Sequence, residues 1–351
     1  MNLEENKLLA PFTTCGIGGP ARWFVEAASE DEIVEATAWA HEQGLKLIVL
    51  GGGSNLLVSD AGFDGLVLRV ALLGIEAYAD GPAGNVLGEW VYRAATGEDW
   101  DRFVTRVVRD NCAGVECLAG IPGTVGGTPV QNVGAYGQEV ASAIERVRVF
   151  DLAQREFVEF SGTECGFGYR RSRFNSADRG RFIVTSVAYR LTLGGAPTLR
   201  YADLKQYFEH CGHEPSLAEV AAVVRRVRQS KGMLLVEGDP DCRSAGSFFK
   251  NPVVSEELAG QIEVVGAKEM PRFPAGPGMV KVPAAWLIEQ AGFAKGYALG
   301  RAGVSSRHTL ALVNRGGASA QEVLALAMDI RQAVEARFGV GLEMEPVLVG
   351  F

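Results

Sequence analysis

The chain has 351 residues with a formal net charge of −8 at pH 7, and 47% of its residues are hydrophobic. This length is enough for two or three domains with separate cores, and the acidic balance argues against a nucleic-acid-binding protein. Six cysteines at irregular spacing and four histidines without a ligand pattern argue against a disulfide framework and predict no metal site. The acidic N-terminus has no signal-peptide core, so we expect a cytoplasmic protein. We expect it to be a monomer that binds neither nucleic acid nor a membrane.

Residues 22–70 are predicted to contain strands around a single helix. Residues 22–27 form a strand, and Ser29 with Glu32 forms a capping box that opens a helix ending at Gly44. The periodicity of apolar residues predicts a buried face on this helix and three further strands. The face consists of Ile33, Ala36, Thr37 and Ala40, and the strands cover 45–50, 56–58 and 65–70.

Helices and strands continue to the C-terminus. Helices are predicted over 99–110, from Ser216, over 284–291 and from Ser319 to Gly339, and strands over 143–150, 155–160, 182–193, 309–314 and 341–350. Residues 77–87 show little pattern. Ser216 and Ser319 each precede a glutamate by three residues, as in a capping box. The basic run Arg225, Arg226 and Arg228 is interpreted as a solvated helix end rather than an anion site.

Two glycine-rich loops stand out. Residues 118–137 contain six glycines and no charged side chain, and Gly51-Gly52-Gly53-Ser54-Asn55 follows a buried strand. Glycines held by packed neighbours let backbone N–H groups approach an anion such as a phosphate. A glycine-rich structural turn is the alternative for either loop alone, but two loops favour a bound dinucleotide. A Rossmann site is disfavoured, because Leu56 stands where the third glycine belongs and β-type residues follow it.

A serine-containing turn is the first candidate for chemistry. Residues 244–252, SAGSFFKNP, place Ser247 and Asn251 beside two phenylalanines. The segment lacks the G-x-S-x-G pattern, and no helix is predicted after it, so a Ser-His-Asp hydrolase is disfavoured.

Two charged groups are further candidates. Arg170, Arg171 and Arg173 lie within four residues and could neutralise a carboxylate or a pyrophosphate, although a solvated loop explains them equally simply. Glu343 and Glu345 are predicted to share one face of the last strand with Val347 and Val349. Desolvation there would raise the pKa of a glutamate and suit it to hold a proton, whereas charge on an edge strand is the alternative.

The order of these motifs resembles the UDP-N-acetylenolpyruvoylglucosamine reductase family, flavoenzymes of peptidoglycan synthesis. The resemblance covers nearly the whole chain, and LGGGSNLLV, IPGTVGGTPVQNVGAYG and AGSFFKNP are specific in combination. The matching segments are FTTCGIGGPARW (12–23), LGGGSNLLV (50–58), TGEDWDRFV (96–104), IPGTVGGTPVQNVGAYG (121–137), FGYRRS (167–172), AGSFFKNP (245–252), VKVPAAWLIEQAG (280–292) and LEMEPVLVG (342–350).

The resemblance implies an α+β fold with the two-subdomain FAD-binding architecture of the vanillyl-alcohol oxidase/PCMH type and a substrate-binding lid. The first FAD subdomain would comprise residues 1–70 plus 341–351, the second 71–214 and the lid 215–340. It also implies noncovalent FAD, NADPH as reductant, and a UDP-sugar, UDP-N-acetylglucosamine enolpyruvate, as substrate. Residues 199–204 and the long lid resemble the type I subclass, which closes a tyrosine-bearing loop over its substrate.

The resemblance also implies roles for individual residues. Arg170 and Glu345 would stabilise charge on the substrate, and Ser247 would donate a proton. The cofactor would contact Gly51, Gly52, Gly53, Ser54, Asn55, Leu56, Pro122, Gly123, Thr124, Gly126, Gly127, Asn132, Ala135, Tyr136 and Val184. The substrate would contact Tyr201, Lys231, Asn251, Lys281, Lys295 and His308.

The sequence departs from the family pattern at a few places. Arg171 stands where an acidic residue is common, Pro346 follows rather than precedes Glu345, and the loop over 232–244 is longer. Two alternatives are a flavin oxidase or dehydrogenase for another alcohol or sugar, and a non-catalytic flavin or UDP-sugar binding protein. Neither has a reason to retain Ser247, Arg170 and Glu345 together.

Overall fold

The computed structural model describes residues 1–80, 88–209, 211–266 and 268–351. The chain folds into two units, each assembled from segments that are separated in the sequence. Unit 1 comprises Met1–Lys7, Ala21–Gly52 and Asp64–Arg228, and unit 2 comprises Leu8–Pro20, Gly53–Phe63 and Gln229–Phe351. The three-part division into FAD subdomains and lid stays a prediction.

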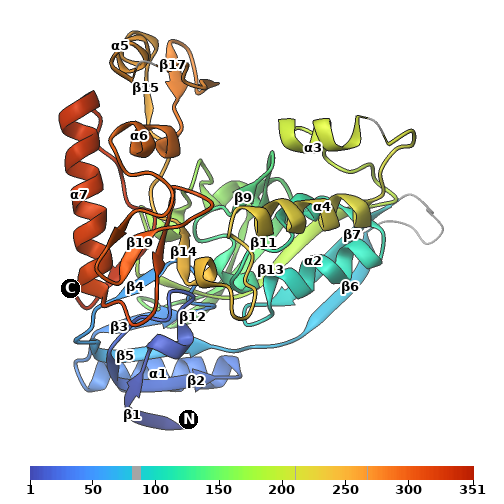
Figure 1. The fold of residues 1–351 in the computed structure, drawn as a ribbon. Coiled ribbons are helices and arrows are strands. Elements are labelled where there is room, and N and C mark those ends of the chain that lie inside the picture. The colour runs from blue at the N-terminus through green and yellow to red at the C-terminus, as the bar shows by residue number, and fades with distance from the viewer. Residues whose placement is uncertain (81–87, 210, 267) are drawn as a thin grey trace. The chain divides into compact units, whose positions relative to one another are not determined.

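Unit 1 begins with a four-stranded sheet in the order β1-β2-β5-β3. Its strands are β1 (Leu3–Leu8), β2 (Pro20–Ala27), β5 (Phe63–Val70) and β3 (Leu47–Leu50), and α1 (Glu30–Glu42) packs against it (Figure 1). The Ser29 hydroxyl accepts the Glu32 N–H at 3.2 Å, and the Glu32 carboxylate accepts the Ala28 N–H at 2.7 Å. The predicted buried face of this helix is confirmed, since its buried residues are Ile33, Ala36, Thr37 and Ala40. The predicted capping box forms only in half, because the Ser29 hydroxyl caps the helix but the Glu32 carboxylate bonds the Ala28 N–H instead of the Ser29 N–H.

A larger antiparallel sheet in unit 1 has the order β12-β11-β13-β7-β6, and β8 pairs with the C-terminal end of β13. The strands are β6 (Ile75–Asp80), β7 (Glu89–Ala95), β8 (Cys112–Ala113), β11 (Ile144–Asp151), β12 (Glu156–Ser161) and β13 (Phe182–Leu193). In the register, Val187 of β13 lies opposite Val147 on one side and Ala94 on the other. The predicted strand over 182–193 is therefore the centre of this sheet. Most of the weakly patterned stretch 77–87 lies outside the described residues.

Helices α2 (Trp100–Arg109) and α4 (Leu217–Ser230) contribute to the core of this larger sheet. Trp100 and Phe103 stack with ring centroids 5.4 Å apart, and Phe103 also contacts Tyr189 of β13 at 4.8 Å. The apolar periodicity of these helices predicts that Val108 and Val227 are buried, but both are only partly buried. Shorter elements complete the unit: α3 (Ala202–Phe208), β9 (Gly134–Ala135), β10 (Gln138–Glu139) and the 3-10 turns η2 (Glu116–Leu118), η3 (Val125–Gly127), η4 (Val140–Ser142), η5 (Gly162–Cys165) and η6 (Arg173–Asn175).

Unit 2 contains two small antiparallel sheets and a parallel strand pair. The first sheet is β14 (Ser244–Ser247), β20 (Ala311–Asn314), β19 (Ala302–Val304) and β18 (Ala298–Leu299), and the second is β15 (Val253–Ser255), β17 (Met279–Lys281) and β16 (Phe273–Pro274). The strand pair joins β4 (Leu56–Val58) to β21 (Val347–Val349). The 3-10 turns η1 (Ala10–Phe12) and η7 (Pro240–Cys242) also belong to this unit.

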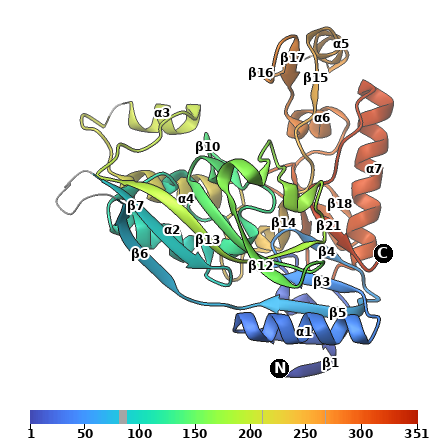
Figure 2. The same ribbon diagram turned by 180° about the vertical axis from the view of Figure 1, so that it is seen from behind.

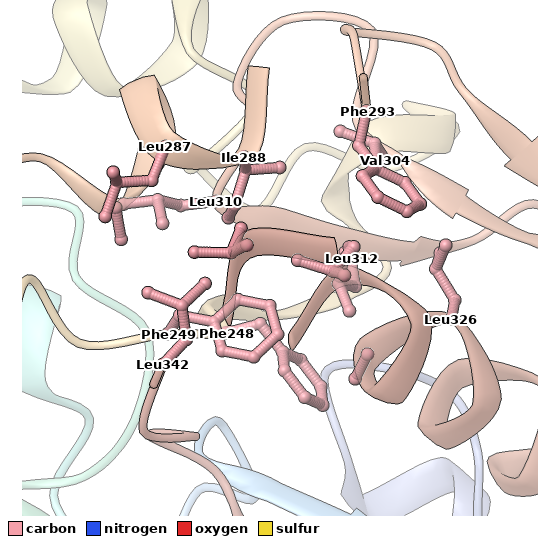
Figure 3. Close-up of a cluster of buried hydrophobic side chains, with 14 of the residues drawn as sticks. Phe248, Phe249, Leu287, Ile288, Phe293, Val304, Leu310, Leu312, Leu326 and Leu342 are labelled. Carbon is pink, nitrogen blue, oxygen red and sulfur yellow. The ribbon is translucent and has the colours of Figure 1, made fainter. Parts of the chain in front are cut away.

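Helices α5 (Glu256–Gly266), α6 (Ala284–Gln290) and α7 (Ala320–Phe338) surround the core of unit 2. Helix α7 lies against β19, as Figure 1 shows, and Figure 2 shows the helix from behind. Figure 3 shows Phe248, Phe249, Leu287, Leu312 and Leu326 gathered in this core.

The last predicted strand is too long. β21 covers only Val347–Val349, because Pro346 has no N–H group to donate to a ladder. The predicted common face is also wrong: Val349 is buried, whereas Val347 and Glu343 are exposed and Glu343 forms an ion pair with Lys250.

Candidate functional site

The two glycine-rich loops meet inside unit 1. A Cβ atom added to Gly52 would lie 2.5 Å from the Gly123 Cα, and one added to Gly51 would lie 3.0 Å from the Thr124 Oγ1. Only glycine at position 52 allows the two backbones to approach this closely. A Cβ on Gly127, by contrast, would meet nothing within 4 Å. Two adjacent uncharged glycine backbones form the kind of cradle that accepts a phosphate, so these residues fit a dinucleotide.

The second loop is fastened to the beginning of α2. The Trp100 N–H donates to the Gly123 carbonyl at 3.1 Å, and the Val125 N–H donates to the Glu98 carbonyl at 2.9 Å. Pro122 and Thr124 flank Gly123 at this attachment. Gly126 packs so closely on Thr96 that a side chain there would overlap it.

The remainder of the first loop belongs to unit 2. Gly53 has a positive φ of 62°, and a Cβ there would collide with the Phe12 carbonyl. The Asn55 side chain donates to the Glu345 carbonyl at 3.3 Å, and the Asn55 carbonyl accepts the Val347 N–H at 2.9 Å. Leu56, next to it, opens β4. The predicted cofactor residues 51–56 are thus divided between the units.

Two predicted cofactor residues have clear structural roles. The buried Asn132 amide donates to the Gly168 carbonyl at 2.9 Å and to the Glu139 carboxylate at 3.0 Å, and its oxygen accepts the Ala141 N–H at 3.1 Å. Val184 is buried in β13 as part of the core. Asn132 thus supports the second loop and Val184 the core, and the contact of either residue with a cofactor stays a prediction.

Of the three clustered arginines, Arg170 contacts the second loop. Its guanidinium donates to the Gly134 carbonyl at 2.9 Å, from a residue in the left-handed region at φ 53°. Arg171 is exposed, and Arg173 bonds Asp178 at 2.7 Å. The segment therefore presents one arginine to the loop rather than a triple cluster.

Ser247 and Glu345 lie on neighbouring stretches of backbone in unit 2. Phe248 links them: its N–H donates to the Leu310 carbonyl at 2.7 Å, and its carbonyl accepts the Glu345 N–H at 2.9 Å. Its ring is buried beside Phe249 (Figure 3). The two predicted catalytic residues of this unit are thus brought together by the core beneath them.

His308 lies near two predicted substrate lysines. Burial, followed by the positive charges of Lys231 and Lys295, lowers the pKa of His308 to about 4. Its Nδ1 accepts the Leu310 N–H at 3.1 Å, so the neutral ring carries its proton on Nε2. The three residues form a cationic group with a neutral donor, which suits an anionic ligand such as a diphosphate.

The other predicted substrate residues are spread over several elements. The Asn251 Oδ1 accepts the Ala284 N–H at 2.9 Å and so caps the beginning of α6, while Lys281 ends β17. Tyr201 precedes α3 in unit 1, and its ring meets Tyr136 edge-on with centroids 5.3 Å apart. The structure therefore joins Tyr201 to the second loop.

The interpretation of the basic run in α4 as solvated is wrong for Arg228. This residue is 9% exposed, and its Nε donates to the Gly120 carbonyl at 2.9 Å. Burial lowers the pKa of its guanidinium, against the opposing effects of Tyr136 and Asp101. The sequence carried a signal, because Arg228 follows the buried Val224 by four residues and so lies on the same helix face.

Within the described residues, no group of three or more histidine, cysteine, aspartate or glutamate side chains could hold a metal ion. Across the same part of the chain, every helix is too short or too polar to cross a membrane.

In comparisons with known proteins, both glycine-rich loops fall within a segment that matches a cofactor-binding family. Residues 21–161 match the FAD binding domain family, and residues 239–349 match the C-terminal domain of UDP-N-acetylenolpyruvoylglucosamine reductase. The chain is 44% identical to the reductase of that name from Thermobifida fusca, covering 99% of this chain and 98% of the relative, and 45% identical to that from Nocardia farcinica, covering 99% and 90%. The crystal structure of the Thermus caldophilus reductase superposes with a TM-score of 0.67 at 28% identity, covering 99% of both chains.

These matches confirm the α+β fold and the FAD-binding domain expected from the motifs. The chain belongs to the UDP-N-acetylenolpyruvoylglucosamine reductase family.

Proposed function

We propose that this protein reduces UDP-N-acetylglucosamine enolpyruvate to UDP-N-acetylmuramate, with NADPH as reductant and noncovalent FAD as carrier. The family relationship over the full chain supports the activity. In this structure, the observation that supports it is the placement of Ser247 and Glu345 on adjacent backbone segments. The Glu345 N–H donates a hydrogen bond to the carbonyl of Phe248, the residue after Ser247. An acid and a hydroxyl on one rigid backbone pair suit the reduction of an enolpyruvyl double bond.

The overall reaction adds a hydride and a proton to that double bond. The two glycine-rich loops would hold FAD, which, once reduced by NADPH, would supply the hydride for the terminal methylene carbon. Negative charge would then develop toward the substrate carboxylate, and we propose that Arg170, by its positive charge, and Glu345, as an acid that donates a hydrogen bond, stabilise it. Ser247 is proposed to donate the proton to the neighbouring carbon, because a weak acid can act by position beside a strongly basic carbon.

The nucleotide end of the substrate is proposed to bind the cationic residues. Lys231, Lys295 and His308 suit the diphosphate, since His308 offers a neutral N–H donor near two positive charges. Asn251 and Lys281 are proposed to complete this site, and Tyr201 to cover it. We also propose that the enzyme works in the cytoplasm as a monomer.

A flavin oxidase for another alcohol or sugar is the competing function. Such an enzyme would use oxygen as acceptor and has no need for Ser247. The test is to mix the purified protein with NADPH and UDP-N-acetylglucosamine enolpyruvate and to follow NADPH absorbance. We expect NADPH oxidation that depends on the UDP-sugar and yields UDP-N-acetylmuramate. NADPH oxidation at the same rate without the sugar would contradict the proposal.

A further inference from the structure

A network of buried polar groups joins the two ends of the second glycine-rich loop. Glu116 in η2 is fully buried, and its carboxylate accepts three hydrogen bonds: from the Gly114 N–H at 2.8 Å, from the Thr198 N–H at 2.7 Å and from the Gln138 amide at 2.8 Å. All three donors are neutral. A buried carboxylate persists only when its oxygens are satisfied in this way.

Gln138 is the centre of this network. Its amide nitrogen donates to Glu116 and to the Thr198 Oγ1 at 3.1 Å, and its oxygen accepts the Cys117 N–H at 2.7 Å. The side chain is 6% exposed, so both ends of the amide are used within the protein. Glutamate could not make these bonds without placing a second carboxylate beside Glu116.

The network holds the chain that leads to Tyr201. Thr198 is bonded at its N–H by Glu116, at its hydroxyl by Gln138, and at its carbonyl by the Cys117 thiol at 3.1 Å. Burial raises the pKa of this thiol, which keeps it protonated and able to donate. Tyr201 follows Thr198 by three residues, so its Cα lies within about 11 Å of this anchor.

The same network fixes the end of the glycine-rich loop. Gln138 follows Tyr136 and Gly137, and a Cβ on Gly137 would lie 2.9 Å from the Arg200 Cβ. Tyr136, in the left-handed region at φ 49°, meets the Tyr201 ring edge-on. The loop and the tyrosine-bearing segment are therefore tied to one side chain, Gln138.

We infer that Gln138 is a positioning residue for Tyr201. Together with Glu116 it anchors Thr198 behind the second glycine-rich loop and so sets where Tyr201 can lie over the diphosphate of the substrate. The inference rests on the proposed function, because Tyr201 is taken to cover the UDP-sugar. It predicts that Gln138 affects substrate binding through Tyr201.

The test is a double-mutant cycle between Gln138→Leu and Tyr201→Ala, read by the KM for UDP-N-acetylglucosamine enolpyruvate and by kcat. In the wild-type background Gln138→Leu is expected to raise KM by about tenfold, with a smaller change in kcat. In the Tyr201→Ala background the same substitution is expected to change KM less than about twofold, since the residue it positions is gone.

Two further variants serve as controls. Asp151→Asn perturbs another buried carboxylate of unit 1, which accepts the Ala153 N–H at 2.8 Å, and should leave KM unchanged. If Gln138→Leu does not fold, Thr198→Val removes only the hydroxyl and should show the same coupling to Tyr201→Ala. Equal KM factors in both tyrosine backgrounds, or a KM effect explained by lost FAD, would overturn the inference. Wild-type protein that fails to turn over the UDP-sugar would overturn the proposed function, and this inference with it.

Discussion

Ser247 is placed by its neighbours on both sides. Gly246 before it has a positive φ of 73°, which a residue with a side chain adopts only under strain, and Phe248 after it is anchored in the core of unit 2. The serine is therefore held rigidly at the end of β14. A proton donor that acts by its position requires such a fixed placement.

Ser247→Ala is expected to lower kcat by about 10²–10⁴-fold, as for the loss of a positioned acid. FAD content and substrate affinity should be retained, because the phenylalanine pair beneath the serine is unchanged. Stopped-flow absorbance of the flavin and steady-state rates measure the two effects. Ser247→Cys, with a more acidic donor in the same place, should recover part of the rate. Turnover of the alanine variant within tenfold of wild type would exclude Ser247 as the donor.

His308 should make stability depend on pH. Its pKa of about 4 in the folded protein lies below the ordinary value of 6.5, so protonation favours the unfolded chain. The free energy of unfolding should therefore fall as the pH drops from about 6.5 to 4, by at most about 3 kcal/mol. His308→Gln, which can still accept the Leu310 N–H, should remove this part of the pH dependence. Urea unfolding of both proteins at pH 7 and pH 4.5 measures it.

Lys295→Met tests whether a nearby positive charge contributes to the lowered pKa of His308. Removing one positive charge should raise the pKa of His308 toward its ordinary value, which an NMR titration of the ring would show. His213 provides the opposite case, because its hydrogen bond to Glu219 raises its pKa. An unchanged His308 titration would mean that the charge of Lys295 does not contribute to the lowered pKa.

At the scale of elements, the glycine-rich loops show two different uses of glycine. Gly52 allows the close approach of two backbones, whereas Gly127 adjoins open space. Gly52→Ala should therefore prevent the loops from meeting and abolish FAD binding, with a loss of stability in the apoprotein. Gly127→Ala should leave the stability of the apoprotein unchanged. Thermal unfolding of both apoproteins, with FAD titrations, separates the two cases. Equal stability of the two alanine variants would contradict this account of the loops.

α7 shows how one element depends on local and distant residues together. Its predicted capping box is confirmed: the Ser319 hydroxyl accepts the Glu322 N–H at 3.1 Å, and the Glu322 carboxylate accepts the Ser319 N–H at 2.8 Å. The first two helical N–H groups, of Ala320 and Gln321, donate instead to Asp60 at 2.8 and 3.1 Å. Local sequence thus predicted half of the cap, and a residue 260 positions away supplies the other half.

At the scale of the whole molecule, FAD is expected to bind noncovalently and to stabilise the protein. Neither glycine-rich loop contains a histidine or a cysteine to which a flavin could be attached. Acid precipitation should release all of the flavin into the supernatant. Added FAD at about 100 times its Kd should raise the free energy of unfolding of the apoprotein by about 2.7 kcal/mol. Flavin retained in the precipitate would indicate a covalent bond and contradict this prediction.

Much of the fold followed from local patterns in the sequence. The buried face of α1, the bounds of β13, the serine N-cap at Ser29 and the capping boxes at Ser216 and Ser319 were predicted because each depends on residues within a few positions of one another. Elements with weaker patterns, α3, α5 and the strands β14 to β19 of unit 2, were not predicted. The strands β14 to β19 are two to four residues long, which is too short to show an alternation of apolar and polar residues.

The sequence by itself determined the family, the two glycine-rich loops and the residues proposed for chemistry, because motifs keep their order along the chain. Only the tertiary structure decided which of these residues meet. It set Gly52 against Gly123, linked Ser247 to Glu345 through Phe248, buried Arg228 and left Glu343 at the surface. Burial and desolvation depend on neighbours that are distant in sequence, and a local pattern does not contain them.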